Sequence, residues 1–197
     1  MKLILIRHEE RNSNIGFFEN LTDKGLYNAE YIIPNKINNI TSKVDYIFSS
    51  PYYRTLQTIK FYAKMNNHKI NVENSLCEYI NNTYFIYNKW KYNWNEINNS
   101  EYNDITKIFN NNYKSLINIE EINNNKKYIL ETEEDLKNRI NNFINYLKNN
   151  YDNSNTIVIS THLNFINMVY YLYNNDNSNN KYLLNKFDFV KIIVINI

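Results

Sequence analysis

The sequence predicts an α/β fold, in which a mainly parallel central sheet lies between two layers of helices. The first observation behind this prediction is that short apolar runs, at residues 2–6, 44–48 and 156–160, alternate with longer amphipathic stretches. Such runs are typical of strands buried on both faces, and helices connect parallel strands through right-handed crossovers. The second observation is that basic side chains directly follow these runs, at the strand ends where open α/β sheets bind ligands.

The first strand is predicted over residues 2–6, and a helix follows from about residue 23 to 33. Thr22 is the expected N-cap of this helix, because a threonine hydroxyl can accept a hydrogen bond from the backbone of the first turn. Pro34 is expected to end the helix, because proline has no N–H group to continue the hydrogen-bond ladder.

A second strand, turn and helix follow the first unit. The strand is predicted over residues 44–48, and a turn follows at residues 49–51. Residues 53–65 then repeat apolar side chains at the spacing of an amphipathic helix. Residues 69–72 are predicted to form a further short strand.

The carboxyl-terminal part is predicted to continue this alternation. A helix from about residue 132 to 149 begins with acidic residues, which interact favourably with the positive end of the helix dipole. A strand at residues 156–160, a helix from about residue 164 to 173 and a final strand at residues 189–195 complete the predicted fold.

Residues 79–130 are expected to be an insertion within a single domain that spans residues 1–197. This segment is rich in Asn, Tyr and Trp, and helices are predicted near residues 84–95 and 104–117. We expect the insertion to cover one end of the sheet and to line a ligand pocket there. It carries no motif that predicts a particular substrate.

The composition of the chain argues against several classes of protein. Its two glycines cannot supply a phosphate-binding loop or a dinucleotide site, so no ATP or NAD cofactor is expected. The net charge of +2 is too small to predict nucleic acid binding, and no apolar run is long enough to span a membrane. The single cysteine, and an apolar start too short for a signal peptide, predict a cytoplasmic protein. The composition predicts no oligomeric state.

Basic side chains gather at the predicted strand ends. They are Arg7 and His8 after the first strand, Arg54 after the second, and His162 after the strand at 156–160. Arginine presents paired donors that fit phosphate oxygens, so we expect a pocket for a phosphoryl group. No cluster of His, Asp and Glu with metal-ligand spacing lies near these strand ends, so no metal is expected. Cys77 is not followed by an arginine, which argues against a cysteine-dependent phosphatase.

Several short motifs follow one another along nearly the whole chain. They are Arg7 to Glu10, Asn14, Leu21 to Gly25, Ser49 to Thr58, Leu76 to Glu78, and Ser160 to His162. In their order and spacing these motifs resemble those of the histidine phosphatase superfamily, which has the phosphoglycerate-mutase-like fold. One Arg-His pair is weak evidence for that family, whereas the ordered set is strong evidence.

The resemblance implies a phosphomonoesterase that acts through a phosphohistidine on a small or peptide-borne phosphate ester, without cofactor or metal. His8 is the implied nucleophile. The implied phosphate ligands are Arg7, Asn14, Arg54 and His162. General chemistry agrees, because phosphoryl transfer needs an in-line neutral nucleophile and fixed positive donors. Neighbouring arginines disfavour the charged imidazolium and so keep His8 neutral.

Three carboxylates need separate interpretation. Glu78 matches the family's general acid, which protonates the leaving oxygen, and Glu10 is the second candidate. Glu9 departs from the family, which usually has Gly or Ala after the histidine. A Glu9 that faces the phosphate would repel it, whereas a Glu9 that points outward would have no effect. We expect the outward orientation.

Two other functions are alternatives to hydrolysis. A phosphoglycerate mutase would return the phosphoryl group to a different hydroxyl, but the chain lacks the longer insertion and C-terminal tail usual in family mutases. A catalytically dead member would only bind a phosphorylated ligand, with Glu9 as its lesion. The joint presence of Arg7, His8, Arg54, Glu78 and His162 argues against that second alternative.

Overall fold

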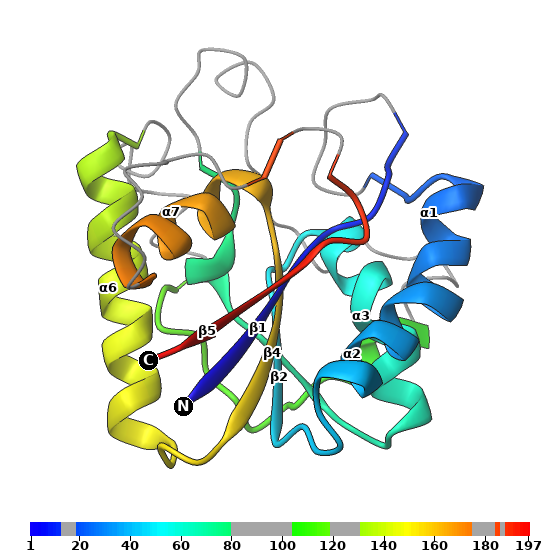
Figure 1. Ribbon diagram of the computed structural model, residues 1–197, viewed down its shortest axis with the longest axis horizontal. Helices are drawn as coiled ribbons and strands as arrows, with labels where there is room; N and C mark the ends of the chain where they lie inside the picture. Colours follow the sequence, from blue (N-terminus) through cyan, green and yellow to red (C-terminus); the bar gives the residue numbers. More distant parts are fainter. Residues whose placement is uncertain (13–18, 80–103, 119–130, 175–183, 186–187) are drawn as a thin grey trace.

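The computed structural model describes residues 1–12, 19–79, 104–118, 131–174, 184–185 and 188–197. They form a five-stranded sheet with strand order β3-β2-β4-β1-β5 (Figure 1). The strands are β1 (Lys2–Arg7), β2 (Tyr46–Ser49), β3 (Ile70–Val72), β4 (Thr156–Thr161) and β5 (Ile192–Asn196). All pairings are parallel except that of β1 with the edge strand β5. The predicted mainly parallel sheet is therefore confirmed.

Helices cover both faces of the sheet (Figure 1). They are α1 (Asp23–Tyr27), α2 (Ile33–Ile40), α3 (Tyr53–Met65), α6 (Glu133–Asn150) and α7 (Leu163–Tyr173). Successive residues of β1 point to opposite faces, as in any strand. Leu3 and Leu5 belong to the core cluster of α6 and α7, whereas Ile4 and Ile6 belong to that of α2 and α3. The predicted three layers are confirmed.

One helical stretch joins α1 to α2 through a π-helical turn, Asn28–Ile32. Thr22 caps its start as predicted, because the Thr22 hydroxyl accepts a hydrogen bond from Gly25 N at 3.1 Å. The prediction that Pro34 ends the helix is wrong. Pro34 lies in the first turn of α2, directly after the wider π turn, where the missing N–H disturbs the hydrogen-bond ladder less.

The predicted helix at residues 104–117 is also wrong, because only residues 104–106 of this segment are helical. The backbone of Ile70 in β3 instead donates to Ile108 O at 2.8 Å and accepts from Asn110 N at 2.9 Å. The unpaired edge of a strand offers such partners, and here they outweigh helical propensity. The predicted helix at 84–95 lies outside the described residues.

The other predicted strands and helices are present with small shifts at their ends. The largest shift is in the final strand, which begins at Ile192 rather than at residue 189. Among the described residues, no helix is both long enough and apolar enough to cross a membrane.

Candidate active site

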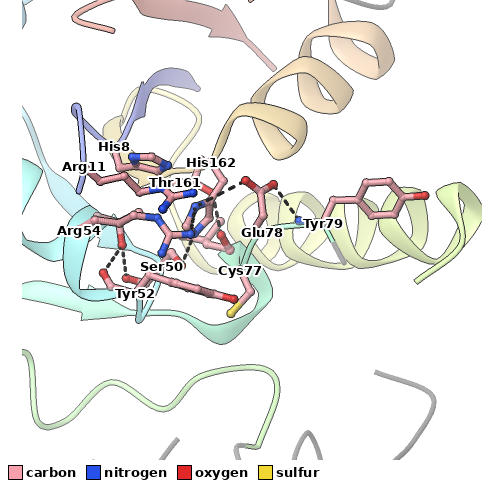
Figure 2. Close-up of polar contacts among 12 residues, drawn as sticks. His8, Arg11, Ser50, Tyr52, Arg54, Cys77, Glu78, Tyr79, Thr161 and His162 are labelled. Carbon is pink, nitrogen blue, oxygen red and sulfur yellow. Dashed lines mark hydrogen bonds and ion pairs between the residues drawn. The ribbon is translucent and has the colours of Figure 1, made fainter. Parts of the chain in front are cut away.

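Strand register places two histidines side by side. β1 and β4 are parallel neighbours in which Arg7 is paired with Thr161, so the next residues, His8 and His162, emerge at the same edge of the sheet. His8 N donates to Thr161 O at 2.9 Å, and the two imidazole centroids are 5.4 Å apart (Figure 2). The prediction that both histidines follow strands of the parallel sheet is confirmed, and the two strands are neighbours.

The His8 imidazole is buried, and a backbone carbonyl sets its tautomer. His8 Nδ1 lies 2.9 Å from Glu9 O, and Nδ1 must carry the proton because a carbonyl oxygen only accepts. The lone pair on Nε2 is therefore available for attack. Burial, with the charges of Arg54 and Arg7, holds the pKa of His8 well below its ordinary value. The ring is neutral at physiological pH.

The His162 imidazole is fully buried beside His8. Its Nε2 lies 2.9 Å from Ser50 Oγ, and its Nδ1 lies 3.4 Å from Arg54 Nη2. Since a guanidinium only donates, Nδ1 accepts this bond and Nε2–H donates to Ser50. Burial and the nearby Arg54 charge hold the pKa of His162 well below its ordinary value. This second ring is also neutral.

Two buried arginines supply positive charge around the histidines. Arg54 lies in the first turn of α3, with its guanidinium carbon 4.2 Å from the ring centre of Tyr52 and Nη1 3.9 Å from Glu19 Oε2. Arg7 ends β1, with its guanidinium carbon 4.5 Å from the ring centre of Phe189. Burial lowers the pKa of both arginines, but a guanidinium stays protonated in proteins. The two guanidinium groups therefore bring fixed positive donors to the cluster.

Glu78 brings a carboxylate to the same cluster (Figure 2). Its Oε1 accepts a hydrogen bond from Tyr79 N at 2.9 Å, and its Oε2 lies 3.9 Å from His162 Nδ1. Burial raises the pKa of Glu78, although Arg54 and Arg7 act in the opposite direction. A carboxyl group with a raised pKa keeps its proton closer to neutral pH, which suits a general acid.

Arg139 of α6 holds the segment that precedes Glu78. Arg139 Nη1 donates to Ser75 O at 2.6 Å and to Cys77 O at 2.9 Å. The same guanidinium pairs with both carboxylate oxygens of Glu131, at 2.6 and 2.7 Å. This buried pair fixes the path of the backbone that carries the candidate acid.

The remaining predicted site residues lie apart from the histidine cluster or outside the described residues. The Glu10 carboxylate contacts Thr22 Oγ1 and Lys24 Nζ, both at 3.3 Å, at the start of α1. Glu9 turns away from the histidines as expected, but it does not point outward, because it is fully buried. Asn14 lies outside the described residues.

Sequence reasoning gave no role to several residues that the fold brings to the cluster. Ser50 and Tyr52 lie within a recognised motif, but only their contacts with His162 and Arg54 reveal what they do. The sequence did contain a signal for Arg139, because this residue lies between Leu136 and Ile140 on the apolar face of its helix. That face is buried in the structure. Among the described residues, no group of three or more His, Cys, Asp or Glu could hold a metal ion.

Comparisons with known proteins place the chain in a family. The model described as Histidine phosphatase superfamily (branch 1) matches residues 3–186. Comparison with curated protein sequences gives no significant match.

Several solved structures are similar to the chain. The ecdysone phosphate phosphatase from Bombix mori, in complex with tungstate, is 13% identical with a TM-score of 0.62, and the match covers 98% of this chain and 88% of that one. A putative alpha-ribazole-5'-P phosphatase from Escherichia coli is 15% identical with a TM-score of 0.53, covering 88% and 80%. A mycobacterial glucosyl-3-phosphoglycerate phosphatase with inorganic phosphate is 12% identical with a TM-score of 0.53, covering 87% and 78%. At these identities the likeness shows a shared fold.

Proposed function

The chain belongs to the histidine phosphatase superfamily, and we propose on this basis that it is a metal-independent phosphomonoesterase. We propose that His8 is the nucleophile, that Glu78 is the general acid, and that Arg7, Arg54 and His162 bind the phosphate. The proposed substrate is a small or peptide-borne phosphate ester, and the proposed compartment is the cytoplasm. Because the similar structures named above carry phosphatase names, hydrolysis is preferred over phosphoryl transfer to a second hydroxyl.

The observation that carries this proposal is the state of the His8 ring. Its Nδ1 proton is bonded to Glu9 O at 2.9 Å, and burial keeps the ring neutral, so Nε2 holds a lone pair beside two buried guanidinium groups. A neutral nitrogen nucleophile among fixed cations is the arrangement that phosphoryl transfer to histidine requires. The second neutral imidazole, His162, would donate to a phosphoryl oxygen in its other tautomer, in which Ser50 Oγ donates to Nε2 and Nδ1 carries the proton.

The first step transfers the phosphoryl group from the ester to the protein. His8 Nε2 attacks phosphorus in line with the ester oxygen, the N–P bond forms and the P–O ester bond breaks. The leaving oxygen takes a proton from Glu78, whose raised pKa favours the protonated form. Arg7 and Arg54 balance the charge on the phosphoryl oxygens during the transfer.

The second step returns the protein to its starting state. The Glu78 carboxylate takes a proton from a water molecule as the water oxygen attacks phosphorus. The N–P bond breaks, inorganic phosphate leaves, and His8 is again neutral with its proton on Nδ1. No step requires an external proton carrier, because Glu78 acts first as acid and then as base.

A turnover assay with p-nitrophenyl phosphate tests the proposal. The parent protein is expected to release nitrophenolate at the same rate with and without EDTA, and His8→Ala is expected to abolish this release while keeping the fold. His68→Ala is the matched control, because His68 lies after α3 and outside the cluster. Activity of His8→Ala within about tenfold of the parent would contradict the proposal. A rate that depends on added Mg²⁺ or Mn²⁺, or isomerisation of phosphoglycerate without hydrolysis, would contradict it as well.

A further inference from the structure

The Glu9 side chain is unusual because it is fully buried immediately after the proposed nucleophile. Its Oε2 accepts a hydrogen bond from Asn28 Nδ2 at 3.0 Å, and its Oε1 accepts one from Val190 N at 2.9 Å. Asn28 begins the π-helical turn, and Val190 lies just before β5, so the carboxylate joins two segments that are far apart in the sequence. A buried carboxylate is retained only where donors satisfy it, as they do here.

The peptide groups of Glu9 are held as firmly as its side chain. Glu9 N donates to Thr58 Oγ1 at 3.0 Å, and the same hydroxyl donates to Arg54 O at 2.8 Å within α3. Glu9 O accepts from His8 Nδ1 at 2.9 Å. The carbonyl that fixes the tautomer and orientation of His8 therefore belongs to a residue anchored at three other points.

The segment around Val190 contacts both neighbours of the nucleophile. Val190 has a positive φ of 54°, a conformation that β-branched residues rarely adopt, and it directs its N–H to Glu9. In the same segment, Phe189 lies against the Arg7 guanidinium, and Asn185 O accepts from Arg7 Nη1 at 3.2 Å. Arg7 and Glu9, the two neighbours of His8, thus both contact the carboxyl-terminal part of the chain.

We propose that Glu9 is a positioning residue for His8. Its backbone N–H is bonded to α3, and its carboxylate is bonded to the π-helical turn and to the segment before β5; together these contacts fix the carbonyl that orients the nucleophile. The family usually has Gly or Ala here, and neither side chain can make these carboxylate contacts. Glu9 therefore gives the residue after the nucleophile a buried hydrogen-bonded anchor. This proposal rests on the proposed function, because orienting Nε2 matters only if His8 attacks phosphorus.

Two substitutions of Glu9 test the proposal at different strengths. Glu9→Gln keeps the shape and one acceptor oxygen, whereas Glu9→Ala removes both acceptors. We expect kcat for p-nitrophenyl phosphate to fall about 10- to 100-fold in Glu9→Ala and less in Glu9→Gln, with KM changed less than about threefold. Asn28→Leu, which removes one donor, should lower kcat in the same direction. Glu134→Gln is the matched control, because the Glu134 side chain is 71% exposed at the start of α6.

The tautomer of His8 separates positioning from a merely structural role. Long-range ¹⁵N NMR can resolve it, because the chain has only three histidines. The parent should show His8 with its proton on Nδ1, and the Glu9 and Asn28 variants should show a growing fraction with the proton on Nε2. If folded Glu9→Gln keeps the parent tautomer and kcat per folded molecule, the proposal is wrong. If Glu9→Ala does not fold, Glu9→Gln and Asn28→Leu still decide the question.

The proposed function and the positioning proposal fail in different ways. If the parent hydrolyses no phosphate ester, the proposed function is wrong, while the NMR measurement still reports whether Glu9 sets the His8 tautomer. If the parent is active and the His8 tautomer does not respond to Glu9, only the positioning proposal is wrong.

Discussion

The two sides of the site are held by different kinds of contact. The strand-end side, with His8 and His162, is set by the register of β1 and β4 and by the backbone bond from His8 N to Thr161 O. The acid side, with Glu78, is set by side chains such as Arg139, which bonds to backbone carbonyls on the approach to Glu78. Register is a property of the sheet as a whole, whereas a side-chain contact depends on one residue. On the acid side a substitution outside the cluster should therefore disturb mainly the acid, whereas on the strand-end side only the Glu9 anchor depends on single side chains.

A buried carboxylate gives the acid side a second anchor. Glu73, at the end of β3, accepts from Ser75 N at 2.7 Å, from Ser115 Oγ at 2.9 Å and from Leu116 N at 3.0 Å. The hydroxyl of Tyr113 also donates to Glu73. These contacts join the segment before Glu78 to residues 113–116. The acid is thus placed by parts of the chain that are distant in sequence.

Among substitutions that leave the nucleophile in place, the largest effect is expected from Glu78→Gln, which removes the proposed acid and leaves the strand-end side intact. The rate should fall about 10²- to 10⁴-fold for an alkyl phosphate, whose leaving oxygen needs a proton, and much less for p-nitrophenyl phosphate. Steady-state assays with both esters measure the difference. Equal losses with the two esters would move the acid role to another group, and Glu10→Gln would then be the next variant to measure.

The pH profile of the alkyl phosphate reaction sharpens this comparison. The acid must be protonated, and because burial raises the pKa of Glu78, kcat/KM should fall only as pH rises through a value above the ordinary glutamate range. His8 must be neutral, and because burial lowers its pKa, activity should persist below the ordinary histidine range. In Glu78→Gln the fall at higher pH should disappear. A profile unchanged by this substitution would contradict the assignment of Glu78.

The next effect is expected from Arg54→Ala, on the strand-end side. Loss of a buried charged partner should weaken phosphate or vanadate inhibition by about 2 to 4 kcal/mol and should also lower kcat. The loss should be similar for both esters, because the proposed contact of Arg54 is with the phosphoryl group and not with the leaving oxygen. An unchanged inhibition constant would exclude Arg54 from the phosphate site. Lys60→Ala in the same helix is a control outside the cluster.

The smallest effect on rate is expected from Arg139→Met, which tests the acid side from a distance. Breaking the buried pair with Glu131 should lower the free energy of unfolding by about 3 kcal/mol. In the folded protein, activity should fall about tenfold for the alkyl phosphate and less for p-nitrophenyl phosphate. Denaturation curves and the two-ester assay measure these effects. Equal loss with both esters would show that Arg139 supports the whole fold and not the acid in particular.

The sequence was sufficient for the parts of the molecule that local patterns control. Apolar runs predicted the strands of the sheet, and amphipathic stretches predicted the helices that cover it. The positions of His8 and His162 after two apolar runs predicted that both lie at strand ends. Pro34 was misinterpreted because the π-helical turn before it is not visible in hydrophobic periodicity. The helix predicted at residues 104–117 is wrong because pairing with the edge strand β3 is a tertiary contact, which helical periodicity does not reveal.

The site was less predictable where buried polar side chains contact residues that are far away in the sequence. The sequence predicts an outward, inert Glu9, because a carboxylate facing the pocket would repel the phosphate that the neighbouring residues are suited to bind. Its burial depends on donors from Asn28 and Val190, and no local pattern brings those residues together. The role of Arg139 has the same origin, because its partners come from residues 75–77 and from Glu131.

The most direct test of the central claim is to trap the covalent intermediate. The parent protein is mixed with p-nitrophenyl phosphate, quenched at alkaline pH, where phosphohistidine survives, and digested for mass spectrometry. A phosphoryl group on His8, strongest in Glu78→Gln with its slower dephosphorylation and absent from His8→Ala, is the predicted result. Turnover with no phosphoryl group on His8, or with one on a different residue, would contradict the account.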